Sequence, residues 1–161
     1  VRSRVQRLRL LPLADDVLSG EIEQRNPHHF SQSDDIVSLA QGSLGKALQL
    51  GTEQAVQMHD LVRSWLATTH NLRPIATAQK VLSGAAEKRD EVDAARLFLW
   101  ILRSELRLQR DRVAASGDAS YPAASLEPWT TWLERTLQAE RDLDLLIPAE
   151  QALAACLVQL I

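Results

Sequence analysis

Residues 33–50 have the sequence SDDIVSLAQGSLGKALQL, which predicts two short helices joined by a tight turn. Ser33 is a residue type that caps helix N-termini, and the two acidic residues after it suit the positive end of a helix dipole. Gly42 is placed to end this first helix in a left-handed conformation. Ser43 then predicts the N-cap of a second helix that runs to Leu50. We therefore expect two helices held at a fixed angle.

Residues 39–48, LAQGSLGKAL, resemble the lid of AAA+ ATPases of the clamp-loader branch, in particular the delta-prime family of bacterial DNA polymerase III subunits. The residues that carry this motif are Gly42, Ser43, Leu44, Gly45, Lys46, Ala47 and Leu48. In relatives that hydrolyse ATP, the position of Gly45 is usually an arginine that contacts the terminal phosphates. Because glycine has no side chain, the resemblance implies a subunit that keeps the ATPase architecture without hydrolysing ATP, and no cofactor bound by this chain.

The composition favours a mostly α-helical protein. Of the 161 residues only 4% are aromatic, and Leu and Ala dominate the apolar residues, which favours helices over a β-sandwich. The net charge of −3 argues against nucleic-acid binding through bulk electrostatics. The single cysteine, Cys156, excludes an intramolecular disulfide and fits a reducing compartment. Since no apolar run reaches the roughly 18 residues that span a bilayer, we expect a cytoplasmic protein with no membrane partner.

Residues 1–13, VRSRVQRLRLLPL, alternate between polar and apolar side chains, which is typical of a half-buried strand. The chain opens inside this strand and without methionine, so we expect it to be part of a longer protein. Ser3 and Arg4 resemble the Ser-Arg-Cys motif that closes the ATPase core of clamp-loader subunits, although Val5 replaces the cysteine. The resemblance implies that Arg4 is an arginine finger, which stabilises phosphoryl transfer on a neighbouring subunit's ATP. A solvated strand face is the alternative.

The remaining helix signals predict two domains. A helix over residues 13–24 completes a three-helix lid over residues 1–51, together with the short strand at its start. Residues 52–161 predict a bundle of about five helices, and by resemblance this is a collar domain that joins the subunits of the loader ring. The helices of the bundle are expected to begin near Thr52, Pro74, Asp90, Ser125 and Pro148.

Two helices of this bundle have distinctive patterns. The helix from Asp90 is apolar nearly all round over residues 94–102, which predicts a central position, whereas its arginine-rich C-terminal half is expected to face solvent or a partner. The last helix carries an apolar stripe at helical spacing. This stripe consists of Leu153, Cys156, Leu157, Leu160 and Ile161.

No catalytic or metal-binding motif occurs in the sequence. There is no Gly-rich phosphate-binding loop, and His28 and His29 lack further ligands at useful spacing, so no metal is expected. The resemblance implies gamma/tau and delta subunits as partners through the collar, and the sliding clamp and primer–template DNA as partners of the assembled complex. Two alternatives remain open. One is the lid and collar of a hydrolysing gamma/tau-type subunit, against which Gly45 argues, and the other is an unrelated helical adaptor whose lid-like motif reflects helix capping alone.

Overall fold

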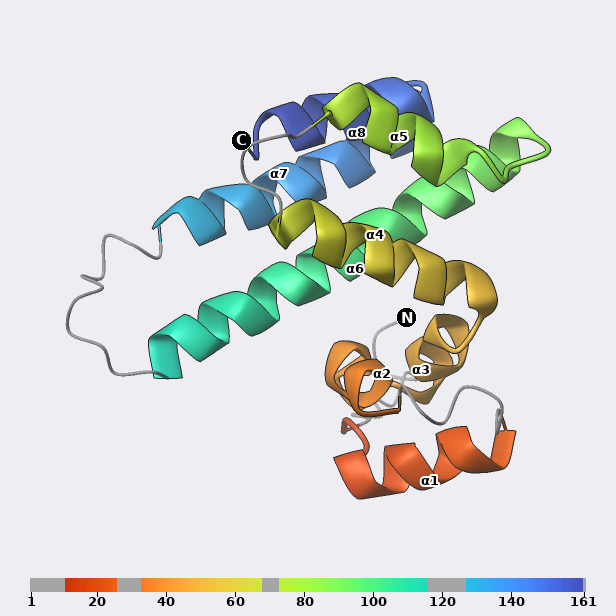
Figure 1. The fold of residues 1–161 in the computed structure, drawn as a ribbon, viewed down its shortest axis with the longest axis vertical. Coiled ribbons are helices and arrows are strands. Elements are labelled where there is room, and N and C mark those ends of the chain that lie inside the picture. Colours follow the sequence, from red (N-terminus) through yellow and green to blue (C-terminus); the bar gives the residue numbers. More distant parts are fainter. Residues whose placement is uncertain (1–10, 26–32, 68–72, 116–126, 161) are drawn as a thin grey trace, which may run out of the picture. The chain divides into compact units, whose positions relative to one another are not determined.

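A computed structural model describes residues 11–25, 33–67, 73–115 and 127–160 (Figure 1). These residues form eight α-helices and no strand, which confirms the mostly helical class. The chain divides into two compact units, Val1–Thr52 and Glu53–Ile161, and the sequence places the boundary one residue earlier, after Gly51. The predicted N-terminal strand lies outside the described residues. None of the described helices has the length and apolar character needed to cross a membrane.

Unit 1 contains three mutually packed helices, α1 (Asp15–Arg25), α2 (Ser33–Ala40) and α3 (Leu44–Leu50). The helices are short, so their stability depends on burying one apolar face each rather than on helix propensity. The core of the unit consists of Leu18 and Ile22 from α1, Ile36, Val37, Leu39 and Ala40 from α2, and Ala47 and Leu50 from α3. Every helix of the unit therefore contributes to one small core.

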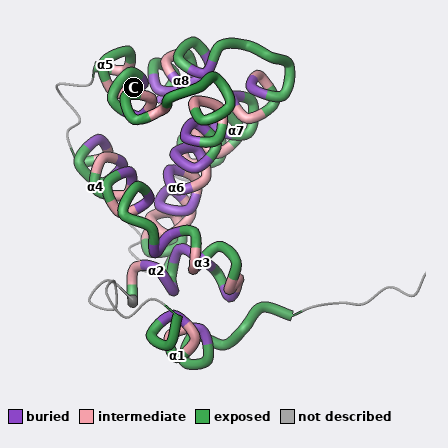
Figure 2. The backbone as a smooth tube through the Cα atoms, turned by 90° about the vertical axis from the view of Figure 1, so that its right-hand side faces the viewer, coloured by how far each residue is buried: buried purple, intermediate pink, exposed green. Residues whose placement is uncertain are grey.

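Unit 2 is a bundle of five helices arranged around a long central one. These are α4 (Glu53–Ala67), α5 (Pro74–Leu82), α6 (Lys88–Ala115), α7 (Glu127–Asp144) and α8 (Ala149–Val158). The other four helices all contact α6, and the buried middle of α6 runs through the bundle (Figure 2). The central position predicted from the apolar run is confirmed, because Phe98, Leu99, Ile101 and Leu102 are fully buried.

The central helix differs from its prediction at both ends. It begins at Lys88 rather than Asp90, because the Asp90 carboxylate accepts a hydrogen bond from the Glu87 backbone N–H at 3.2 Å and so lies inside the first turn. Its C-terminal half is more covered than expected. Ser104, Glu105 and Leu106 are buried, because α4 and α7 pack along this part of the helix.

Candidate functional site

The turn between α2 and α3 has the left-handed geometry that its sequence predicts. Gly42 has φ of 75°, and the preceding Gln41 is also left-handed, with φ of 50°. The Gln41 N–H still bonds the Val37 carbonyl at 3.3 Å, and the Ser43 N–H bonds the Ala40 carbonyl at 3.0 Å. The turn thus satisfies two of the last four carbonyl groups of α2, those of Val37 and Ala40.

Glycine at position 42 is required by its neighbours as well as by its backbone. The Leu13 N–H donates to the Gly42 carbonyl at 2.9 Å, so the segment before α1 lies directly against the turn. A Cβ atom on residue 42 would lie 2.4 Å from Pro12 Cβ and 2.8 Å from the Leu13 carbonyl oxygen. The segment before α1 therefore lies so close to the α2–α3 turn at Gly42 that a side chain at this position would overlap it.

Ser43 caps α3 as predicted. Its backbone is extended, and its Oγ accepts a hydrogen bond from the Lys46 N–H at 3.5 Å. The Ser43 carbonyl accepts the first bond of the helix, from the Ala47 N–H at 2.9 Å. Ala47 is buried, while Leu44 and Leu48 are partly buried and Lys46 is exposed. The motif thus combines a helix cap with part of the core of unit 1.

Gly45 has no packing reason to be glycine. It is exposed in the first turn of α3, and among the described residues no heavy atom lies within 4 Å of a Cβ built on it. Its φ is not in the left-handed range. Since glycine destabilises a helix by about 1 kcal/mol relative to alanine, local structure favours almost any other residue here. Position 45 could hold a long side chain without a clash.

Other predicted site residues lie outside the described part of the chain. Ser3 and Arg4 are among them, so the finger role stays a prediction. His28 and His29, at which no metal is expected, also lie outside the described residues. Within the described ranges, no cluster of His, Cys, Asp or Glu is suited to hold a metal ion.

The apolar stripe of α8 lies in the core of unit 2. Leu153 and Leu157 are fully buried, Cys156 and Leu160 are nearly so, and Ile161 is not described. Burial raises the pKa of the Cys156 thiol to about 12, so the thiol stays protonated and packs as a small apolar group. Because α5, α6 and α7 cover α8 within the unit, the four described residues of this stripe are not available to a neighbouring protein.

The sequence did not reveal a buried charge network between α4 and α6. Glu105 Oε1 accepts a hydrogen bond from His59 Nε2 at 2.5 Å, and Arg63 Nε lies 3.8 Å from the same oxygen. The side chains of His59 and Glu105 are only 12% and 7% exposed. The hydrogen bond from His59, reinforced by the charges of His59 and Arg63, lowers the pKa of Glu105 although burial acts in the opposite direction. No local pattern pairs these residues, because they are 46 positions apart.

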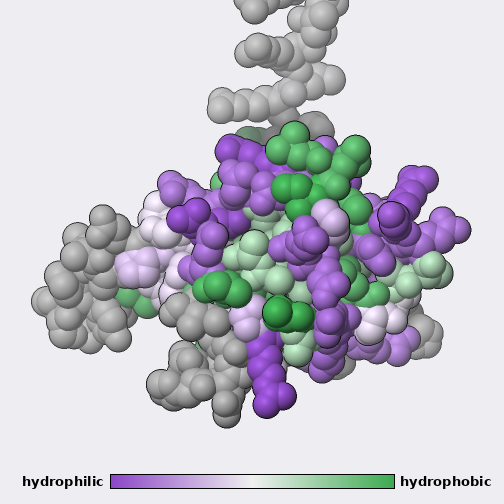
Figure 3. All heavy atoms as spheres, turned by 90° about the horizontal axis from the view of Figure 1, so that it is seen from above, coloured by the Kyte–Doolittle hydropathy of each residue, from purple (hydrophilic) through white to green (hydrophobic). Residues whose placement is uncertain are grey.

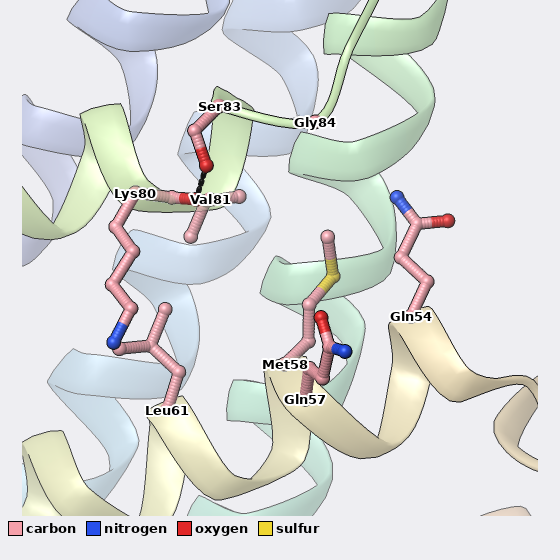
Figure 4. Close-up of a pocket in the computed structure, with 8 residues that line it drawn as sticks. All are labelled: Gln54, Gln57, Met58, Leu61, Lys80, Val81, Ser83 and Gly84. Atoms are coloured by element: carbon pink, nitrogen blue, oxygen red, sulfur yellow. Dashed lines mark hydrogen bonds between the residues drawn. The ribbon is translucent and has the colours of Figure 1, made fainter.

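A groove of about 180 Å³ lies between α4 and the C-terminal end of α5 (Figure 4). It is lined by Gln54, Gln57, Met58, Leu61, Lys80, Val81, Ser83 and Gly84. The side chains of Met58 and Lys80 extend into the space between the two helices. The groove is therefore apolar at its base and carries one positive charge at its rim.

Comparison with known proteins leaves the family open: no family model matches the chain, and no curated protein or solved structure matches it. The clamp-loader resemblance therefore depends on the motif residues and the order of the helices.

Proposed function

We propose that this chain is the lid and collar of a non-hydrolysing clamp-loader subunit of the delta-prime type in bacterial DNA polymerase III. In this role it helps to assemble the loader ring with gamma/tau and delta subunits. The assembled ring opens the sliding clamp and places it on primed DNA during replication. The chain performs no catalysis itself.

The main support for the proposal is Gly45, which lies one turn after the left-handed Gly42 that ends α2. Gly45 is exposed, and the space that a Cβ on it would occupy is free of other described side chains. An arginine at position 45 would project from α3 without touching the core, and it could reach a nucleotide outside the unit. Glycine removes that cation at a position where packing does not require glycine and helix propensity disfavours it. An exposed glycine at this position is expected in a subunit that has lost its ATP-contacting residue but keeps the rest of its lid.

The proposed contribution to chemistry comes from Arg4, by resemblance. An arginine finger supplied to a neighbour's nucleotide stabilises the charge that develops on the transferred phosphoryl group, and such groups contribute roughly 10³-fold or more to hydrolysis. Arginine suits this role because its guanidinium stays charged and presents several N–H donors in one plane. In this proposal the subunit activates its neighbour through Arg4 and lacks its own sensor at Gly45.

The test is reconstitution of the protein that contains this chain with purified gamma/tau-type and delta-type subunits. We expect a stable complex by size-exclusion chromatography with light scattering, and ATP hydrolysis that the sliding clamp and primed DNA stimulate. Arg4→Ala is expected to lower the stimulated hydrolysis while the complex still assembles. The matched control is Arg7→Ala, which removes another arginine of the same segment and is expected to leave hydrolysis unchanged.

Two results would contradict the proposal at different points. If the protein forms no complex with either type of subunit, the clamp-loader assignment is wrong. If the complex forms but Arg4→Ala hydrolyses ATP at the normal rate, the assignment stands and Arg4 is not the finger.

A helical adaptor is the second candidate, and one observation favours it. The connection between α7 and α8 exposes three consecutive apolar residues, Leu145, Leu146 and Ile147, which is typical of a protein-binding surface. An adaptor would fail to bind clamp-loader subunits in the reconstitution above.

A further inference from the structure

The α7–α8 connection forms an apolar knob on the surface of unit 2. We use this name for Leu145, Leu146 and Ile147, which are 72%, 91% and 37% exposed. Strongly hydrophobic residues are also visible at the surface in the view onto α5 and α8 (Figure 3). Single exposed apolar residues are common, but three in succession at a turn form a continuous surface that water covers poorly.

The backbone of the knob is strained at its most exposed residue. Leu146 is left-handed, with φ of 63°. The Ile147 N–H bonds the Asp142 carbonyl at 3.0 Å, and the Leu146 N–H bonds the Leu143 carbonyl at 3.1 Å. This is the helix-ending arrangement in which glycine is usual at the position of Leu146. Glycine would relieve the strain and remove an exposed leucine, and residues that keep such strain are concentrated at functional surfaces.

The groove between α4 and α5 has the size and charge to receive this knob. A cavity of about 150 Å³ is large enough to hold benzene, so a groove of 180 Å³ accommodates a leucine side chain on its base of Met58, Leu61 and Val81. Lys80 is the only charged residue among its described lining, and no carboxylate of the described residues forms an ion pair with it.

Two carboxylates precede the knob at the end of α7. These carboxylates belong to Asp142, which accepts a hydrogen bond from Gln138 at 2.8 Å, and to Asp144. The Asp144 side chain is 62% exposed even though it pairs with Arg96. In Figure 2, α4 and α7 lie on opposite sides of α6.

We propose that this chain associates head to tail, with the apolar knob of one copy in the α4–α5 groove of the next and the exposed Asp144 carboxylate of the first copy beside Lys80 of the second. The two surfaces differ, so the contact is heterologous and can continue from copy to copy. Because three residues bury far less than the roughly 800 Å² per partner of a stable interface, the association is weak. This inference does not depend on the clamp-loader assignment.

The experiment measures the mean mass of the purified chain by small-angle X-ray scattering up to about 1 mM, a concentration at which a contact with a dissociation constant of that order is well populated. The knob variant is Leu146→Asp, since Asp tolerates a left-handed backbone. The groove variant combines Lys80→Glu with Gly84→Glu. Both positions are exposed, and a Cβ at Gly84 meets no described heavy atom within 4 Å, so the fold is expected to persist.

The wild-type mass is expected to rise with concentration, and each variant alone is expected to stay monomeric. An equimolar mixture of the two retains one intact knob and one intact groove, so it is expected to form dimers and nothing larger. A wild type that is monomeric throughout, a knob variant that associates normally, or a mixture that stays monomeric would each overturn the proposal.

Two control variants separate association from folding. Leu146→Gly is expected to raise the melting temperature, because it relieves the left-handed strain, and yet to abolish association. Ile75→Asp removes an exposed apolar residue that is neither in the knob nor in the groove lining, and it is expected to leave association unchanged. If Ile75→Asp abolishes association as completely as Leu146→Asp, the contact is non-specific and the proposal is wrong.

Discussion

Replacement of Glu105 by glutamine tests whether the buried network between α4 and α6 stabilises unit 2. The substitution keeps the shape of the side chain and removes its charge, which leaves His59 and Arg63 without the carboxylate that they share. Hydrogen bonds to charged groups contribute about 1.5–3 kcal/mol, and removing one partner of a buried pair reaches about 3–5 kcal/mol. Because glutamine can still accept a bond from His59, we expect the lower range, a loss of about 2 kcal/mol at pH 7.

The stabilisation that Glu105 provides should depend on pH. The pKa of Glu105 is lower in the folded protein than its ordinary value of 4.5, so folding favours the ionised carboxylate. The stabilisation is therefore fully present above about pH 5 and is lost as the pH falls through the lowered pKa of the folded state. Glu105→Gln has no such group, so its stability should approach that of the wild type as the solution is acidified.

The assay is urea denaturation followed by tryptophan fluorescence. All four tryptophans lie in unit 2, at positions 65, 100, 129 and 132, so the signal reports that unit alone. The matched control is Asp111→Asn, which neutralises an acidic residue of the same helix in an exposed pair with Arg110. Such pairs contribute less than about 1 kcal/mol. If Glu105→Gln is as stable as the control at pH 7, or if its deficit persists in acid, the reasoning is wrong.

Three further substitutions test the core and the lid-like turn. Gly42→Ala should destabilise unit 1 by about 2–3 kcal/mol, because alanine is strained in the left-handed conformation and its Cβ would overlap Pro12. Hydrogen exchange of the backbone amides in α2 and α3 should then become faster. Unchanged exchange would contradict the geometry of the turn. Gly45→Arg should leave that exchange unchanged or slow it, because arginine is the better helix former by up to ~1 kcal/mol, and faster exchange would show that packing requires the glycine. Leu157→Asp should unfold unit 2, with a loss of about 4 kcal/mol or more and collapse of the fluorescence transition, whereas a native transition would remove Leu157 from the core.

Local chemistry explains why most helix boundaries could be predicted. The stop at Gly42 and the cap at Ser43 involve hydrogen bonds between residues no more than four positions apart, so the sequence contains all the information they need. The predicted start of α6 is wrong by two residues, because the sequence allows two positions for its first acidic residue. An acidic residue such as Asp90 can stand at the cap or within the first turn, and the bond from Glu87 decides which.

The candidate site was predictable only where its residues are neighbours in sequence. The lid-like motif falls within one short stretch, so the sequence alone shows that glycine occupies position 45, whereas the exposure of Gly45 comes from the structure. The groove between α4 and α5 could not be foreseen, because Met58 and Lys80 face a common space only when both helices pack on α6. The left-handed backbone of Leu146 could not be predicted either, because nothing in the sequence indicates that a leucine adopts this conformation.

By itself, the sequence determined the helical class, the two groups of helices and the turn at Gly42, because composition, periodicity and capping act within a few residues. Only the tertiary structure decided that the stripe containing Leu153 and Leu157 is core, since a stripe that faces a core and one that faces a partner have the same period. It also decided which charges meet. His59 and Glu105 pair because two helices cross at those residues, and that crossing depends on packing along their whole length.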